Sequence, residues 1–259
     1  MMKILLIAFL GLAAASQAYA AIQTQLIEYK DGEVTMEGYL AYDDAGQAQR
    51  PGVIVVHDWM GFGSFANTKA EELAKLGYVA LAIDIYGKDV RPRDTKEAAI
   101  QAGIYKGDRA LMRRRARAGY DVFKNHPLVA PGKIAMMGYC FGGTVSLELA
   151  RSGAPLRGVV SFHGGLSTPD PGDARQIKAK VLALHGADDP YVPMEEVQTF
   201  QKEMRDANVD WAMIFYGGAV HSFTNPAAGA DNSKGAAYHE KADQRSWGAM
   251  RQFFEEIFK

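Results

Sequence analysis

The sequence predicts an α/β fold in which a mostly parallel sheet carries helices on both faces. Short apolar runs rich in β-branched residues recur along the chain, and stretches with helical periodicity separate them. Such alternation builds βαβ units, which wind right-handed into a parallel sheet. The chain has 259 residues, a length that suits one large domain with a sizeable core.

The first elements fit this pattern in turn. Residues 27–42 alternate loosely and predict an opening hairpin, with Asp31 and Gly32 as its turn signal. Residues 52–57 form a continuous β-branched run, which is typical of a strand buried on both faces. Residues 64–76 then predict a helix that Gly77 terminates.

The alternation continues to the end of the chain. Residues 95–125 predict a long helix, whose four arginines between 113 and 117 we expect on a solvated face. The further expected elements are strands at 78–83, 133–138, 157–162, 180–185 and 210–216 and helices at 144–152, 194–206 and 236–258. Residues 217–236 form one long irregular loop, and long loops in compact domains are usually functional.

Residues 1–20 have the three-part layout of a secretory signal peptide. Lys3 supplies a positive start, residues 4–12 are apolar, and Ala18-Tyr19-Ala20 is a cleavage pattern. The alternative is a transmembrane anchor, but the apolar run is shorter than the roughly 20 residues that a span needs. We therefore expect a signal peptide over 1–20, one α/β domain over 21–259, and a periplasmic or secreted product without membrane contact.

Composition excludes several classes of function. The formal net charge is −1 and the basic clusters are short, so nothing indicates a nucleic-acid partner. The histidines are scattered, without the spacing typical of metal ligands. We expect no metal or cofactor, and the sequence leaves the oligomeric state open.

The strand expected at 133–138 runs into Gly138-Tyr139-Cys140-Phe141-Gly142, the cysteine form of the G-x-S-x-G nucleophile elbow. The nucleophile of an elbow lies on a sharp turn, so the residues two before and two after it must be small. The amide of Phe141 would open the next helix and face an oxyanion. A buried structural cysteine is the alternative. Because Cys140 is the only cysteine and stands at a strand-to-helix turn, we predict that it is the nucleophile.

An acid and a base follow the elbow in the order that α/β-hydrolases use. The strand at 180–185 leads into Asp188 and Asp189, and we favour Asp189 as the acid because Pro190 holds its backbone extended. His221 lies in the loop after the last strand and is the predicted base. His57 and His163 also follow strands, but both precede the acid and are weaker candidates.

With these pieces the chain resembles the dienelactone hydrolase family of α/β-hydrolases over about residues 27–258. The resemblance is specific, because a cysteine elbow is uncommon among α/β-hydrolases. The segments that carry it are Val56-His57-Asp58-Trp59-Met60-Gly61, Asp84-Ile85-Tyr86-Gly87, Gly138-Tyr139-Cys140-Phe141-Gly142-Gly143, Asp189-Pro190-Tyr191-Val192-Pro193 and His221-Ser222-Phe223.

The resemblance implies roles for further residues. Asp58 matches an acid that helps to form the thiolate, although family members often have Glu there; a loop-capping role is the alternative. The amide of Trp59 would be a second oxyanion donor. Tyr86, Lys88 and Asn225 match the substrate-binding region, where dienelactone-specific members use two arginines. Lys88 keeps a positive charge without bidentate geometry, and Asn225 has none, so dienelactone itself is an unexpected substrate.

These observations predict an exported hydrolase that cleaves a small carboxylic ester or lactone through a Cys-His-Asp triad and an acyl-thioester intermediate. One alternative is a generic carboxylesterase or thioesterase on the same scaffold. Another is a non-catalytic exported binding protein that has kept the fold, against which the intact nucleophile, acid and base argue.

Overall fold

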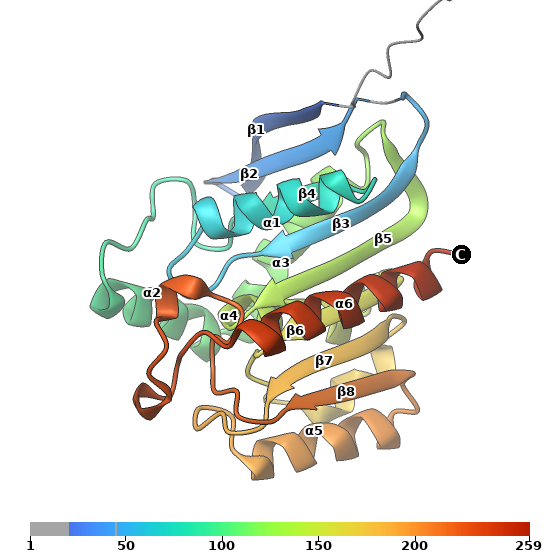
Figure 1. Cartoon of the computed structure of the whole chain (residues 1–259). Helices are drawn as coiled ribbons and strands as arrows, with labels where there is room; N and C mark the ends of the chain where they lie inside the picture. The colour runs from blue at the N-terminus through green and yellow to red at the C-terminus, as the bar shows by residue number, and fades with distance from the viewer. Residues whose placement is uncertain (1–20, 45) are drawn as a thin grey trace, which may run out of the picture.

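The computed structural model describes residues 21–44 and 46–259, so the expected signal peptide at 1–20 lies outside the described residues. One eight-stranded sheet runs through the domain in the order β1-β2-β4-β3-β5-β6-β7-β8 (Figure 1). The strands are β1 (Ile22–Asp31), β2 (Val34–Asp43), β3 (Arg50–Val56), β4 (Val79–Ile83), β5 (Val129–Tyr139), β6 (Gly158–Phe162), β7 (Lys180–Gly186) and β8 (Trp211–Tyr216). β2 pairs antiparallel with β1 and β4, and every other pairing is parallel.

Helices cover both faces of the sheet, as expected from the sequence. They are α1 (Ser64–Lys75), α2 (Thr95–Gly107), α3 (Arg109–Phe123), α4 (Phe141–Arg151), α5 (Met194–Asp206) and α6 (Glu240–Ile257), with short 3₁₀ turns η1 (Pro171–Gln176), η2 (Pro226–Ala228) and η3 (Asn232–Lys234). α1 and α6 pack on one face, seen in front in Figure 1, and share one apolar cluster. α3, α4 and α5 contribute to the cluster on the opposite face. Within the described part of the chain, no helix is both long and apolar enough to span a bilayer.

Two local expectations were wrong. The helix expected over 95–125 is two helices, because the Asp108 side chain accepts a hydrogen bond from the Leu111 amide and so begins α3 where α2 ends. The arginines of α3 do not share a solvated face. Arg115 is only 7% exposed, and its guanidinium pairs with Asp31 of β1 at 3.0 Å. A charge run is therefore a poor guide to exposure where a helix packs against a polar sheet edge.

The strand order places a switch point at the centre of the sheet. The chain passes from β3 to β4 on one side and then returns to build β5 on the other side of β3. The loops that follow β3 and β5 therefore leave in opposite directions and open a crevice at the carboxyl ends of the strands, where ligands bind in open α/β sheets. Cys140 lies directly after β5, at this crevice.

Candidate active site

The turn between β5 and α4 holds Cys140 in a strained backbone conformation, with φ 53° and ψ −114°. The two glycines of this turn leave room for neighbouring backbone atoms. A Cβ added to Gly138 would lie 2.1 Å from the Gly142 carbonyl oxygen, and one added to Gly142 would lie 2.4 Å from that of Val56. No side chain fits at either position, which is the steric requirement expected from the elbow pattern. α4 is buried along its whole length, so packing of this helix fixes the elbow.

Three side chains from separate loops meet at the elbow. His221 Nε2 lies 3.0 Å from Cys140 Sγ, and His221 Nδ1 lies 2.7 Å from Asp189 Oδ2. Asp189 is 6% exposed, whereas the neighbouring Asp188 is exposed. Asp189 Oδ1 also accepts a hydrogen bond from the Tyr191 amide at 2.8 Å, which fixes the direction of the carboxylate. The structure thus brings together the predicted nucleophile, base and acid.

The electrostatics of this contact favour a charged pair. Burial lowers the pKa of His221, but the negative charge of Cys140 and the hydrogen bond to Asp189 oppose burial and raise the pKa to about 10. The positive charge of this imidazolium lies 3.0 Å from Cys140 Sγ, where it would stabilise a thiolate. A thiolate is the nucleophilic form of cysteine.

The loop that carries His221 is held by a small number of long-range hydrogen bonds. The His221 amide donates to the Gly235 carbonyl, and its own carbonyl accepts from Ala237. Three residues farther along, Thr224 Oγ1 lies 2.7 Å from Nε2 of His163, which follows β6. The His163 ring also meets the His221 ring edge-on at a centroid distance of 5.3 Å.

The surroundings of His163 disfavour its charged form. It is 2% exposed, and burial, followed by the positive charge of His221, lowers its pKa well below the ordinary value. From the sequence, His163 is only a weaker candidate base, and no pattern points to Thr224. The available signal was the position of His163 at the carboxyl end of a central strand, where functional side chains gather.

The β3–α1 loop supplies the second predicted oxyanion donor. Tyr86 donates its hydroxyl to the Trp59 carbonyl at 2.9 Å, and His57 Nδ1 lies 2.6 Å from the Asp58 carbonyl. The Ile85 amide donates to His57 Nε2, so His57 is a structural residue that ties this loop to β4. Among the described residues, no recorded backbone hydrogen bond uses the Trp59 amide as its donor. Phe141 begins α4, where amides have no partner within the helix.

Asp58 stands at the edge of this loop. Its Oδ1 accepts from the Met60 amide at 2.8 Å and its carbonyl accepts from Gly61. Burial raises the pKa of Asp58, and the charges of His57 and His221 lower it. Asp58 therefore has the loop-capping role that the sequence left open. Its carboxyl also interacts electrostatically with the charge of His221.

The structure separates the three predicted substrate-binding residues. Lys88 points away from the elbow, because its ammonium pairs with Glu28 of β1. Tyr86 is 3% exposed, and its ring packs against Phe141, the first residue of α4. Asn225 lines a cavity together with Asp58 and Thr224, and its Oδ1 caps η2 by accepting from the Ala227 amide. Only Asn225 is placed where a substrate could meet it.

Comparison with known proteins identifies the family of the chain. Residues 36–258 match the model of the dienelactone hydrolase family. A solved structure described as a dienelactone hydrolase-like promiscuous phosphotriesterase from metagenomic libraries is 42% identical, with a TM-score of 0.88, and the match covers 92% of this chain and 100% of that chain. The Synechocystis sp. protein named "Putative carboxymethylenebutenolidase" is 27% identical over 92% of this chain and 98% of its own.

The same fold also occurs in a protein that is less similar in sequence. The structure of a dienelactone hydrolase from Anabaena variabilis is 20% identical to this chain, with a TM-score of 0.63 and coverage of 89% of this chain and 98% of that one. The family model, by contrast, spans the sheet from β2 onward and includes the elbow, the acid loop and the base loop. The chain belongs to the dienelactone hydrolase family and is a hydrolase with the α/β-hydrolase fold.

Proposed function

We propose that this protein hydrolyses a carboxylic ester or lactone, with Cys140 as nucleophile, His221 as base and Asp189 as the acid that orients the base. The observation that carries the proposal is the continuous contact from Asp189 Oδ2 through His221 to Cys140 Sγ, at 2.7 and 3.0 Å. Nucleophile, base and orienting acid within hydrogen-bond reach are the signature of covalent acyl transfer.

The reaction proceeds in two halves. The Cys140 thiolate attacks the carbonyl carbon, and the amides of Trp59 and Phe141 stabilise the oxyanion. The C–O bond to the alcohol then breaks, and the proton on His221 Nε2 passes to the leaving alkoxide. Water next gives a proton to His221 and attacks the thioester. The C–S bond breaks, which releases the acid and restores the thiolate. In a lactone the alcohol stays attached to the acyl group throughout.

We assign Asp58 the role of assisting acid. Burial raises its pKa, so this carboxyl can exchange a proton with its surroundings nearer to neutral pH than an exposed aspartate. As a carboxylate, Asp58 would help the thiolate to form by stabilising the His221 imidazolium, which takes the thiol proton, when substrate displaces water from the site. We also propose that residues 1–20 direct export and are removed, for which the mass of the protein recovered from a periplasmic or culture fraction is the test.

The test of the function is a substrate panel: an aryl acetate, an enol lactone and a thioester, each offered to the mature protein and to Cys140→Ala and His221→Ala. We expect hydrolysis by the wild type and a loss of about 10³-fold or more in both variants, as removal of one triad member causes. The ranking of the panel separates a lactonase from a general carboxylesterase or thioesterase. Hydrolysis that survives in Cys140→Ala, or a wild type without any activity, would reject this mechanism and favour the binding-protein alternative.

A second activity, on phosphotriesters, has one observation in its favour. The solved structure that is 42% identical over 92% of this chain is described as a promiscuous phosphotriesterase. A phosphotriester is uncharged, and attack of the thiolate on phosphorus would expel an aryloxide as attack on a carbonyl expels an alkoxide. We expect slow release of para-nitrophenol from a dialkyl para-nitrophenyl phosphate, lost in Cys140→Ala. An equal rate in the wild type and in Cys140→Ala would contradict phosphotriester hydrolysis at this site.

A further inference from the structure

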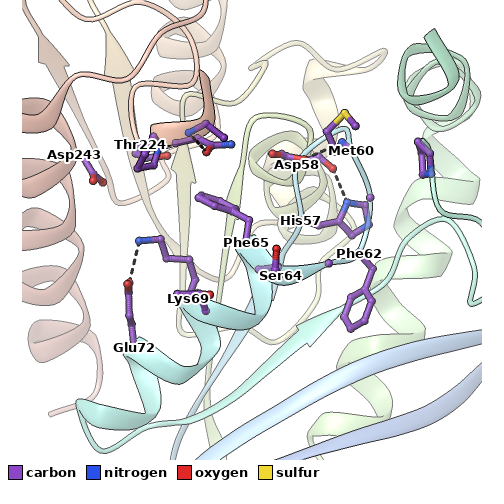
Figure 2. A pocket seen from close by; sticks show the side chains of 18 residues that line it. His57, Asp58, Met60, Phe62, Ser64, Phe65, Lys69, Glu72, Thr224 and Asp243 are labelled. Carbon is purple, nitrogen blue, oxygen red and sulfur yellow. Dashed lines mark hydrogen bonds and ion pairs between the residues drawn. The ribbon is translucent and has the colours of Figure 1, made fainter. Parts of the chain in front are cut away.

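A cavity of about 610 Å³ is lined in part by Asp58, next to the proposed oxyanion donor, and by Thr224 of the base loop. It lies between the β3–α1 loop, the first turns of α1, the segment 224–227 and the start of α6, as Figure 2 shows. Most of the walls near the loop are apolar, including Met60, Phe62 and Phe65. No sequence pattern predicts this cavity, because its walls come from segments far apart in the chain.

Two lining residues connect the cavity to the chemistry. Asp58 directly precedes Trp59, the proposed oxyanion donor, and the charge of His221 acts on the Asp58 carboxyl. Thr224 follows His221 by three residues and is fixed to His163. The cavity therefore opens between the loop of the oxyanion site and the loop of the base.

The far end of the cavity is charged. Lys69 of α1 is its single lysine or arginine among the described lining residues, and its ammonium lies 2.9 Å from Glu72 Oε2 and 5.0 Å from the centre of the Trp247 ring. Asp243 faces this pair from α6 (Figure 2) and accepts a hydrogen bond from the Tyr238 hydroxyl at 3.2 Å. The one positive charge is thus already matched by Glu72.

The remaining acids give the cavity an excess of negative charge. Asp58, Glu72 and Asp243 are three carboxylates against the one ammonium of Lys69. Burial raises the pKa of Asp243; the Lys69 charge and the Tyr238 hydroxyl lower it, and Glu72 raises it further. A substrate carboxylate would add a fourth negative charge beside these three acids and would therefore be disfavoured.

We infer that this cavity holds the uncharged acyl chain of the substrate and that Asp243 and Glu72 make it reject an acyl chain that ends in a carboxylate. The inference rests on the proposed function and names its substrate class. The acyl group is the one to assign here, because it stays bound to Cys140 through both halves of the reaction, whereas the alcohol must leave. The neutral Asn225 in the same wall adds no charge that would hold a substrate carboxylate.

The test uses three para-nitrophenyl esters with acyl chains of similar length: the valerate, the mono-ester of glutarate, and the methyl ester of that glutarate. We expect kcat/KM for the glutarate to fall about tenfold below the two neutral esters at low ionic strength, and the gap to narrow as salt screens the charges. Equal kcat/KM for the glutarate and its methyl ester would overturn the inference.

Two isosteric variants locate the effect. Asp243→Asn and Glu72→Gln, on different helices, should each raise kcat/KM for the glutarate about three- to tenfold and change kcat/KM for the valerate by less than about twofold. Lys69→Met should lower kcat/KM for the glutarate below the wild-type value. Asp206→Asn is the matched control, because this acid lies at the end of α5 and pairs with Lys202. A change in all three esters by the same factor in Asp243→Asn and Glu72→Gln would count against charge selection.

The two proposals fail separately. If valerate hydrolysis does not depend on Cys140, the proposed function is wrong. If it depends on Cys140 but the glutarate ratio does not move in Asp243→Asn and Glu72→Gln, the proposed function stands and the assignment of the cavity is wrong.

Discussion

The nucleophile and the base are positioned in different ways. Cys140 lies between a central strand and a fully buried helix, and the glycines beside it have no room for a side chain. His221 lies in a loop with little regular structure, where its backbone pairs with Gly235 and Ala237 of the same loop. Buried side chains such as Phe223 pack this loop into the core. The elbow therefore has no space for added atoms, whereas the orientation of the base also depends on individual polar contacts. Substitutions of the elbow glycines should lower stability, and removal of a polar contact in the base loop should lower activity.

The largest effect on activity is expected at the acid. Asp189→Asn keeps the shape of the side chain but removes the charge that holds the His221 imidazolium, so kcat should fall by about 10³ to 10⁴-fold, as at comparable triads. Asp188→Asn is the control, since Asp188 is exposed and its amide, rather than its side chain, makes the recorded hydrogen bond, to Ala219. Steady-state kinetics on one aryl ester decide between them. A larger loss in Asp188→Asn would reverse the assignment of the acid.

The elbow should respond through stability. In Gly142→Ala the new Cβ would lie 2.4 and 2.5 Å from the carbonyl oxygens of Val56 and His57, and we expect a loss of about 3–5 kcal/mol in the free energy of unfolding. Gly103→Ala is the matched control, because a Cβ at this exposed position of α2 meets no atom within 4 Å. It should stabilise the protein by about 0.5–1 kcal/mol. Urea denaturation measures both, and equal stabilities would contradict the packing argument.

The base loop should respond through activity. Thr224→Val preserves the shape of the side chain and removes the hydroxyl that contacts His163, so we expect about a tenfold lower kcat from a less well placed His221. Thr224→Ser keeps the hydroxyl and should restore most of the rate. The rate of Cys140 alkylation by iodoacetamide against pH reports on the thiolate directly, because the chain has one cysteine. A valine variant with an unchanged alkylation profile and unchanged kcat would show that this contact does not position the base.

The smallest intervention is a change of pH. The pKa of His221 is raised to about 10, so His221 stays protonated through neutral pH and loses its proton only as the pH rises through that value. Activity that needs this proton for the leaving alkoxide should decline there. In Cys140→Ala the contribution of the thiolate is gone, and the pKa of His221 should fall. An NMR titration of the His221 ring in both proteins tests this, and identical titrations would contradict a charged pair between His221 and Cys140.

Local patterns predicted the parts of the site that local sterics determine. The elbow, the loop acid and the base all follow strands, and chain order distinguishes them without any tertiary information. Lys88 could not be placed in this way, because its direction depends on Glu28, which lies 60 residues earlier in β1. The same holds for Asp243, which reaches the cavity from the last helix. Charges that select substrates come from whichever helices meet at the crevice, and periodicity does not reveal which helices those are.

Several residues at the site have positive φ angles, which lower stability but give the site the geometry that turnover needs. Among the described residues only four that are not glycine have positive φ, and three of them are Cys140 at 53°, His163 at 41° and Ser222 at 57°. Each such residue stores about 1–3 kcal/mol of strain. A laboratory selection for heat resistance alone would therefore favour replacements that relax these three positions, glycine at Ser222 among them. The most heat-resistant descendants would then be poor catalysts, so directed evolution of this scaffold has to screen turnover and melting temperature together.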